Sequence, residues 1–235
     1  MAQGLDTRLL GQLLVLLAHD LRNPLSALHS NIGFLESSTD GSDADLREAL
    51  ADVTVSCGSL NQIIDNLELF GLSTLEEQPR LERLPVSLDE LAKEAVNRAS
   101  SSANSYGAEL VLGPSETAGV RVRVHREMAT RALGNLLFNA IQHGGGGRVS
   151  ISVRVDGANG IVSISDPGFP LAVKLRENAF TAAGQLACKA DPDGRYSRGL
   201  GLFAAGVAAA LAGAQVQCLQ TGEGKNLLEM RAGLV

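Results

Sequence analysis

The segment Asp6–Ser38 reads DTRLLGQLLVLLAHDLRNPLSALHSNIGFLESS. Its apolar side chains recur in steps of three and four residues, which is the spacing of a helix face that packs lengthwise on another helix. They are Leu10, Leu14, Leu17, Leu21, Leu25, Leu28, Ile32 and Leu35. The segment therefore predicts one helix, roughly 50 Å long at 1.5 Å per residue.

A second apolar seam follows after the short polar turn Ser37–Asp43. Its members are Leu46, Leu50, Val53, Cys57, Leu60, Ile64, Leu67 and Gly71. Two such helices joined by a short turn predict an antiparallel hairpin. Because one hairpin leaves much apolar surface uncovered, we expect two copies to pair into a four-helix bundle, which makes the protein a homodimer.

The composition narrows the class of protein further. Hydrophobic residues make up 45% of the 235, charged residues 20%, and the net charge is −6, which argues against a nucleic-acid partner. The longest run without a polar residue, Leu202–Ala212, is far shorter than the roughly 20 residues of a spanning helix, so no membrane insertion is expected. Cys57, Cys188 and Cys218 follow no metal-binding spacing and are expected to be reduced, buried thiols of a cytoplasmic protein.

The rest of the chain has the pattern of a separate α/β domain. We predict a helical hairpin over residues 1–75, a linker over 76–85 and a second domain over 86–235. The second domain opens on Ser87-Leu-Asp-Glu90, a capping box that starts a helix ending near Gly107. Further helices are expected at 126–142 and 200–211, and strands at 108–112, 120–124, 149–155, 161–165, 214–219 and 226–231. Helices interleaved with antiparallel hairpins predict an α/β two-layer sandwich, and hence an α+β chain overall.

A candidate nucleophile lies in the first helix, in the hexapeptide His19-Asp-Leu-Arg-Asn-Pro24. At about 100° per residue, His19 points away from the leucine seam and towards solvent. Asp20 can accept a hydrogen bond from one ring nitrogen and leave the other free to attack, and Asn23 shares the histidine's face one turn later. Pro24 removes one helical hydrogen bond and permits a bend there. The plainer alternative is a surface histidine beside a proline kink.

The stretch Ala18-His-Asp-Leu-Arg-Asn-Pro-Leu25 resembles the phosphoacceptor box of bacterial two-component sensor histidine kinases. The second domain carries segments similar to that family's ATP-binding boxes, in the family's order. They are Arg131-Ala-Leu-Gly-Asn-Leu-Leu-Phe-Asn-Ala-Ile-Gln-His143 (N box), Ile164-Ser-Asp-Pro-Gly168 (first glycine box), Phe180 (F box) and Gly199-Leu-Gly-Leu202 (second glycine box). The resemblance covers nearly the whole chain and implies an ATP-binding domain of the GHKL type.

The resemblance also implies roles for single residues. Nucleotide contacts fall to Asn135, Asn139, His143, Asp166, Gly168, Gly199 and Gly201. An amide oxygen is a hard ligand suited to Mg²⁺, and Asn139 is the residue implied to hold the ion. Asp166 would accept a hydrogen bond from the exocyclic amine of adenine, and the two glycines before the last long helix would face the phosphates. Residues between Phe180 and Gly199 would cover ATP, with Arg195 and Arg198 available to its phosphates.

The implied activity is that of a protein-histidine kinase core. It would phosphorylate its own His19 from Mg-ATP and pass the phosphoryl group to an aspartate of a response-regulator receiver domain. The receiver is expected to dock at Ala27, Ser30, Asn31 and Phe34. Few residues precede His19, so the input signal is expected to arrive either through a partner such as a separate sensor protein or at the helical bundle itself.

Several positions depart from the family pattern. Gln142 replaces a cationic residue of the N box, Pro170 replaces the last glycine of the first glycine box, and Ala183 stands where a second aromatic is common. His125 occupies a place where the family often has Asp, just before the 126–142 helix. These departures leave two alternatives open: a degenerate histidine phosphotransferase or pseudokinase without ATP turnover, and a non-catalytic dimerisation scaffold.

Overall fold

The structure is a computed structural model that describes residues 7–38, 44–74, 81–114, 119–184 and 200–235. The chain divides into two compact units, Met1–Gln78 and Pro79–Val235. Each unit is described by itself.

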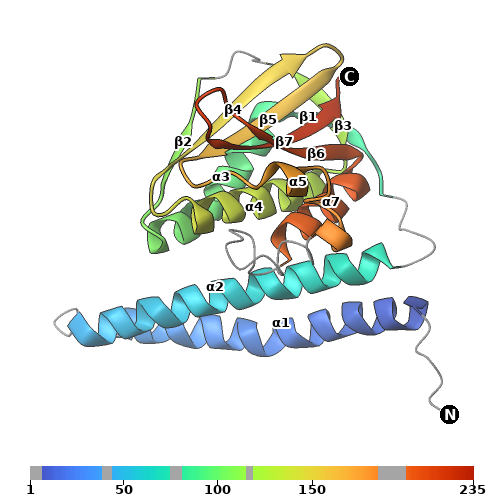
Figure 1. Ribbon diagram of the computed structural model, residues 1–235. Helices are drawn as coiled ribbons and strands as arrows, with labels where there is room; N and C mark the ends of the chain where they lie inside the picture. Colours follow the sequence, from blue (N-terminus) through green and yellow to red (C-terminus); the bar gives the residue numbers. More distant parts are fainter. Residues whose placement is uncertain (1–6, 39–43, 75–80, 115–118, 185–199) are drawn as a thin grey trace. The chain divides into compact units, whose positions relative to one another are not determined.

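The first unit is a pair of long helices, α1 (Thr7–Ser38) and α2 (Ala44–Ser73), which pack lengthwise on each other as the seams predict (Figure 1). Its core consists of residues spaced seven apart on each helix, namely Ala18, Leu25 and Ile32 on α1 and Leu50, Cys57 and Ile64 on α2. This spacing is the heptad repeat of two helices in lengthwise contact.

Most of the other seam residues face outward, and the neighbouring Ile63 does so too. We call this set the outer stripe: Leu10, Leu17, Leu21, Leu28 and Leu35 of α1, and Leu46, Val53, Leu60 and Ile63 of α2. These side chains are between 39% and 60% exposed, whereas the buried core positions of the same helices are at most 8% exposed. The seam therefore divides into one set of residues that closes the hairpin and one set that the hairpin leaves uncovered.

The second unit combines a mixed five-stranded sheet with helices. Its elements are β1 (Leu84–Ser87), α3 (Leu88–Ser105), β2 (Glu109–Leu112), β3 (Arg121–Val124), α4 (Arg126–His143), β4 (Arg148–Asp156), β5 (Asn159–Asp166), α5 (Val173–Arg176), α7 (Gly201–Ala212), β6 (Ala214–Gln220) and β7 (Asn226–Gly233). The strand order is β2-β4-β5-β7-β6, with β2 and β4 parallel and the other neighbours antiparallel. Strands β1 and β3 form a separate antiparallel pair.

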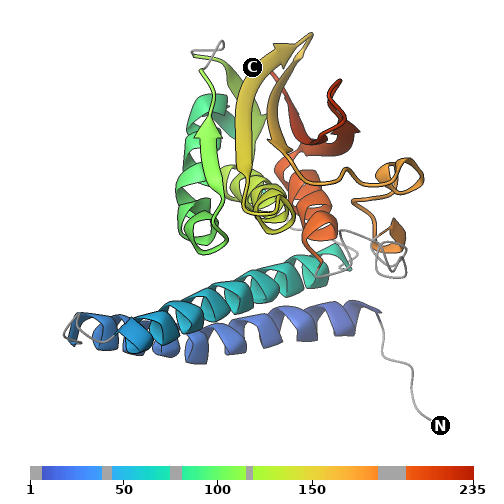
Figure 2. The same cartoon turned by 60° about the vertical axis from the view of Figure 1, so that its left-hand side comes forward.

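Helices α3, α4 and α7 cover one face of the five-stranded sheet, as both views show (Figures 1 and 2). The core between the two layers includes Leu91, Leu133, Leu136, Leu137, Ile141 and Leu202 from the helices and Ile151, Ile161 and Ile164 from the sheet. The two-layer α/β sandwich expected from the sequence is confirmed, following a helical region, in a chain of α+β class.

The junction between the predicted linker and the second domain needs one correction. Helix α3 begins as the capping box predicts, with Ser87 Oγ accepting a hydrogen bond from the Glu90 backbone N–H at 3.4 Å. However, β1 already starts at Leu84, so two residues placed in the 76–85 linker belong to the β1–β3 pair. Leu84 lies opposite Val124 in that pair, and the proline at position 85 is tolerated because this is a two-stranded sheet edge.

Two of the three cysteines lie in the described ranges, and both are free and buried: Cys57 in the hairpin and Cys218 in β6. Cys188 lies outside the described residues. No helix in the described ranges is both long and apolar enough to cross a lipid bilayer.

A buried acidic residue of β7 is hydrogen-bonded to side chains of β4, β5 and β6. The carboxylate of Glu229 accepts hydrogen bonds from Arg154 Nη2 (2.8 Å), Ser163 Oγ (2.9 Å) and Gln217 Nε2 (2.6 Å). Burial raises the pKa of Glu229, but the hydrogen bonds from Arg154, Gln217 and Ser163 outweigh it, so the pKa lies below its usual range. The ionised carboxylate therefore stabilises the folded sheet.

We expect Glu229→Gln to lower the free energy of unfolding at pH 7 by about 1–3 kcal/mol, the range for losing a charged hydrogen-bond partner. The pKa of Glu229 is lower in the folded protein than in the unfolded chain, where it is about 4.3. The ionised carboxylate therefore stabilises the fold at pH values above about 4.3, and this stabilisation is lost as the pH falls through the folded-state pKa. The difference between the variant and the wild type should therefore shrink below about pH 4. Thermal unfolding monitored by circular dichroism from pH 3 to 8 measures it, and a difference that stays constant with pH would contradict the assignment.

Candidate nucleotide and phosphoacceptor sites

His19 lies on α1 with its imidazole in solvent. Its side chain is 74% exposed and that of the neighbouring Asp20 is 81% exposed, and Asn23 is exposed one turn later. The Nδ1 atom of His19 lies 4.0 Å from Oδ1 of Asp20, which is longer than a hydrogen bond. The exposure agrees with the sequence expectation, while the expected hydrogen bond between the two side chains is not formed in this conformation.

Arg22, inside the same hexapeptide, is a residue whose role the sequence did not reveal. Its Nη2 atom donates to Glu68 Oε2 at 2.6 Å and to Asp65 Oδ1 at 2.8 Å, so it bridges α1 and α2. The hydrogen bond to Glu68 raises the pKa of the Arg22 guanidinium, against the opposing effect of burial, and Asp65 adds to the rise. This bridge fixes the register of the two helices beside His19.

Three of the four expected receiver contacts have described side chains. Ser30, Asn31 and Phe34 are all exposed on α1, and at 69% Phe34 is the most exposed large apolar side chain among those described in the hairpin. Ala27 lies in the same helix. A surface of this kind is available to a partner, and the docking role remains a prediction.

Helix α4 carries the N-box residues at intervals of four, so Asn135, Asn139 and His143 share one face. Asn135 is buried and donates from Nδ2 to the carbonyl oxygen of Arg131 at 3.1 Å. Asn139 is 7% exposed, and its side-chain amide makes no hydrogen bond to a described residue. His143, half-buried, is the last residue of the helix. A nearly buried amide without a partner in the described chain is suited to bind a ligand.

The start of α7 meets that helix face. A Cβ atom on Gly201 would lie 2.8 Å from Nδ2 of Asn139 and 3.8 Å from Oδ1 of Asn135. Only glycine leaves this space open, so the second glycine box and the N box come together as the resemblance implies. Gly199, Arg195 and Arg198 lie outside the described residues.

Asp166 ends β5 and is 1% exposed. Its Oδ1 accepts a hydrogen bond from the Gly168 backbone N–H at 2.9 Å, and its Oδ2 accepts one from Asn226 Nδ2 at 2.9 Å. The sequence predicted the carboxylate and the glycine but not Asn226. Only the register of β5 and β7 places Asn226 opposite Asp166.

The positions that depart from the family pattern differ in their exposure. Gln142 is half-buried in α4, Pro170 is half-buried in the loop after β5, and Ala183 is exposed. Phe180 packs on α7, where a Cβ on Gly206 would lie 2.6 Å from its carbonyl oxygen. The F-box residue therefore contacts the helix that follows the second glycine box.

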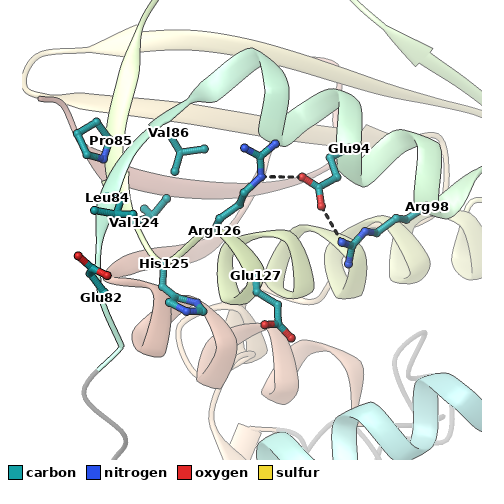
Figure 3. A pocket seen from close by; sticks show the side chains of 10 residues that line it. All are labelled: Glu82, Leu84, Pro85, Val86, Glu94, Arg98, Val124, His125, Arg126 and Glu127. Carbon is teal, nitrogen blue, oxygen red and sulfur yellow. Dashed lines mark hydrogen bonds and ion pairs between the residues drawn. The ribbon is translucent and has the colours of Figure 1, made fainter.

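A separate pocket of about 490 Å³ lies at the other end of α4 (Figure 3). His125 lies there as the N-cap of α4, with Nδ1 accepting from the Met128 backbone N–H at 3.3 Å, as its position in the sequence suggested. The pocket wall carries ion pairs from Glu94 to Arg98 (2.7 Å) and to Arg126 (3.1 Å). Arg126 is about 20 Å from Asn139 along the helix at 1.5 Å per residue, so this pocket is not part of the nucleotide site.

The polar groups around Asn139 are suited to bind a nucleotide together with a hard cation such as Mg²⁺. Two buried amides and the glycine at the start of α7 form a space that a Cβ would fill, and amide oxygens are ligands that Mg²⁺ accepts. Among the described residues, no group of three His, Cys, Asp or Glu side chains gathers to hold a metal. The role of Asn139 as a metal ligand remains a prediction.

Two family models match the chain in the order of these sites. Residues 9–76 match the His Kinase A (phospho-acceptor) domain, and residues 124–228 match the histidine kinase-, DNA gyrase B- and HSP90-like ATPase. The chain belongs to the two-component sensor histidine kinases. His19 lies in the phosphoacceptor match, and Asn139, Asp166 and Gly201 lie in the ATPase match of this histidine kinase.

Curated relatives of this histidine kinase carry sensor-kinase names. The sensor-like histidine kinase SenX3 of Mycobacterium tuberculosis is 29% identical over 165 residues, covering 69% of this chain and 39% of the relative. The signal transduction histidine-protein kinase AtoS of Escherichia coli is 29% identical over 198 residues, covering 77% of this chain and 29% of the relative. The chain thus spans well under half the length of these relatives.

Solved structures show the same fold. Full-length ShkA in complex with AMPPNP matches 95% of this histidine kinase and 46% of that chain, with a TM-score of 0.64 at 20% identity. The histidine kinase ThkA in complex with the response regulator protein TrrA matches 96% of this chain and 62% of that chain, with a TM-score of 0.54 at 19% identity.

Proposed function

We propose that this protein phosphorylates His19 from Mg-ATP and then passes the phosphoryl group to an aspartate of a response-regulator receiver domain. The observation that carries the proposal is the close approach of Gly201 to Asn139, with Asp166 beside Gly144 at the end of the same helix α4, in one unit of a chain whose other unit exposes His19. The comparisons give no support to the pseudokinase alternative. The AMPPNP complex of the structural neighbour ShkA supports ATP as the nucleotide.

The nucleotide would be held by groups of three kinds. The Asp166 carboxylate accepts a hydrogen bond from the exocyclic amine of adenine. Gly201 at the start of α7 presents the positive end of the helix to the phosphates, because a helix N-terminus favours anions. Asn139 holds Mg²⁺, which supplies charge neutralisation for the phosphates when bound.

His19 supplies the nucleophile. The neutral ring attacks the γ-phosphorus through Nε2, forming the N–P bond as the bond to the β–γ bridging oxygen breaks and ADP leaves. Asp20 lies 4.0 Å from Nδ1, and a small rotation brings its oxygen into hydrogen-bond range of the Nδ1 proton. In that position Asp20 stabilises the charge that develops on the imidazole.

The transfer step has a direct test. The chain is labelled with γ-labelled ATP and Mg²⁺, freed of nucleotide, and mixed with isolated receiver domains. We expect the label to leave the kinase and appear on one receiver as an alkali-labile acyl phosphate, and to stay on the kinase when that receiver's aspartate is changed to Asn. Label that leaves the chain only as inorganic phosphate with every receiver would contradict the transfer step.

The outer stripe supports a homodimer. Its residues repeat at the same heptad spacing as those that close the hairpin, so a second hairpin presents a matching surface. The complex of the neighbour ThkA with a response regulator supports a receiver as the other partner. The free thiols of Cys57 and Cys218 support a cytoplasmic location.

Adding charge to the outer stripe should separate the dimer. With Leu28→Lys and Leu60→Lys together, we expect dimer affinity to fall by at least about a thousandfold. Burying each leucine contributes about 1.5–3 kcal/mol, and each substitution is present in both subunits of a symmetric dimer. Sedimentation equilibrium measures the loss. Ser56→Lys, at an exposed α2 position outside the stripe, is the matched control. A wild type that stays monomeric, or a double variant that stays dimeric, would refute the dimer.

A further inference from the structure

A chain of buried polar groups crosses three neighbouring strands behind the nucleotide site. The thiol of Cys218 in β6 donates to Asn226 Oδ1 in β7 at 3.7 Å, and Asn226 Nδ2 donates to Asp166 Oδ2 in β5 at 2.9 Å. All three residues are buried, and Asn226 is completely so at 0% exposure. The strand register holds them in place, because Asn226 lies directly opposite Asp166 in the β5–β7 pair.

This arrangement fixes which end of the Asn226 amide faces Asp166. If the amide were turned over, Asn226 Oδ1 would face Asp166 Oδ2, and two acceptor oxygens would meet with no hydrogen between them. The thiol on the far side is a weak donor and favours the orientation in which Oδ1 faces it. Asn226 therefore presents an N–H to Asp166 as a fixed feature of the fold.

The consequence concerns the hydrogen-bonding character of Asp166. Its two oxygens accept from Gly168 N–H and Asn226 Nδ2, and both donors are satisfied by a carboxylate that only accepts. An acceptor matches the 6-amino group of adenine. The 6-oxo group of hypoxanthine is itself an acceptor, so an acceptor-only Asp166 rejects it.

We infer that Asn226 is a positioning residue that keeps Asp166 an acceptor and so sets the preference for a 6-aminopurine over a 6-oxopurine nucleotide. The inference rests on the proposed ATP site and adds to it the residue that determines its base specificity. Asn226 acts through Asp166 and not by touching the nucleotide.

The experiment compares ATP and ITP binding to the full chain, with dissociation constants from isothermal titration in Mg²⁺. In Asn226→Asp, the N–H that faces Asp166 Oδ2 is replaced by a second carboxyl group, and the two acidic groups repel each other or share the one proton between them. Asp166 then loses the donor that holds its oxygens in place as acceptors for the 6-amino group. We expect the ratio of the ITP dissociation constant to the ATP dissociation constant to fall by about tenfold or more, which corresponds to the free energy of one hydrogen bond to a charged group. In Asn226→Ala, ATP binding should weaken while ITP binding does not, so the ratio falls there too.

Ser163→Ala is the matched control. It removes another buried hydrogen bond to a carboxylate in the same sheet, the one to Glu229, and should lower thermal stability without changing the ratio. A ratio that is unchanged in Asn226→Ala would overturn the inference, even if Asn226→Asp fails to fold. Failure of the wild type to bind ATP would instead overturn the proposed function, so the two failures are distinguishable.

Discussion

Asp166→Asn is expected to weaken ATP binding by about a hundredfold, in line with the loss of hydrogen bonds to a charged acceptor. The amide that replaces the carboxylate has one acceptor oxygen and one NH₂ group, yet two N–H donors, those of Gly168 and Asn226, converge on it. Its NH₂ group must face one of them, so the site can no longer offer adenine an acceptor without leaving a buried donor unsatisfied. Isothermal titration with ATP measures the effect.

Asp156→Asn is the control for this change. It alters charge by the same amount in the β4–β5 hairpin, where the exposed Asp156 accepts from the half-buried Arg231 at 2.9 Å, away from the nucleotide site. ATP affinity should stay within twofold of the wild type, about 0.4 kcal/mol. If Asp166→Asn bound ATP as tightly as Asp156→Asn, the adenine contact would have to lie elsewhere.

Asn139→Ala is expected to slow phosphorylation of His19 by about a thousandfold. A metal ion at the phosphates contributes several kcal/mol of charge stabilisation in the transition state, and each 1.4 kcal/mol is about a factor of ten in rate. The side chain is nearly buried and lies against the start of α7, where a Cβ on Gly201 would be 2.8 Å from its Nδ2. Single-turnover labelling over a range of Mg²⁺ concentrations should show a higher metal requirement together with the lower rate.

Thr130→Ala provides the comparison on the same helix. Thr130 is equally buried, and its hydroxyl donates to the Arg126 carbonyl in the first turns of α4. We expect it to lower thermal stability and leave the labelling rate near that of the wild type. A normal rate in Asn139→Ala would remove this residue from the reaction.

Much of the architecture could be predicted because it depends on local patterns. The steps of three and four placed α1 within one residue of its observed ends and indicated the helix α2, and the capping box at Ser87 located the start of α3. The N-box residues Asn135 and Asn139 share a face because four residues make about one helical turn. These features need only the chain's own periodicity.

The remainder depends on contacts between distant segments. Periodicity shows that Leu25 and Leu28 are both apolar, but not that Leu25 closes the hairpin while Leu28 stays exposed. Arg22 acquires its role only when α2 brings Asp65 and Glu68 beside it. Asn226 likewise matters only through a strand register that no short stretch of sequence encodes.

The most direct measurement is the labelling of His19 itself. Wild type, His19→Gln and His29→Gln are each incubated with γ-labelled ATP and Mg²⁺, and bound label is tested for stability in acid and alkali. His29 is an exposed histidine on the same helix and serves as the matched control. We predict label on the wild type and on His29→Gln that is lost in acid and stable in alkali, and none on His19→Gln. Label that persists on His19→Gln, or a wild type that binds ATP and takes up no label, would contradict the account.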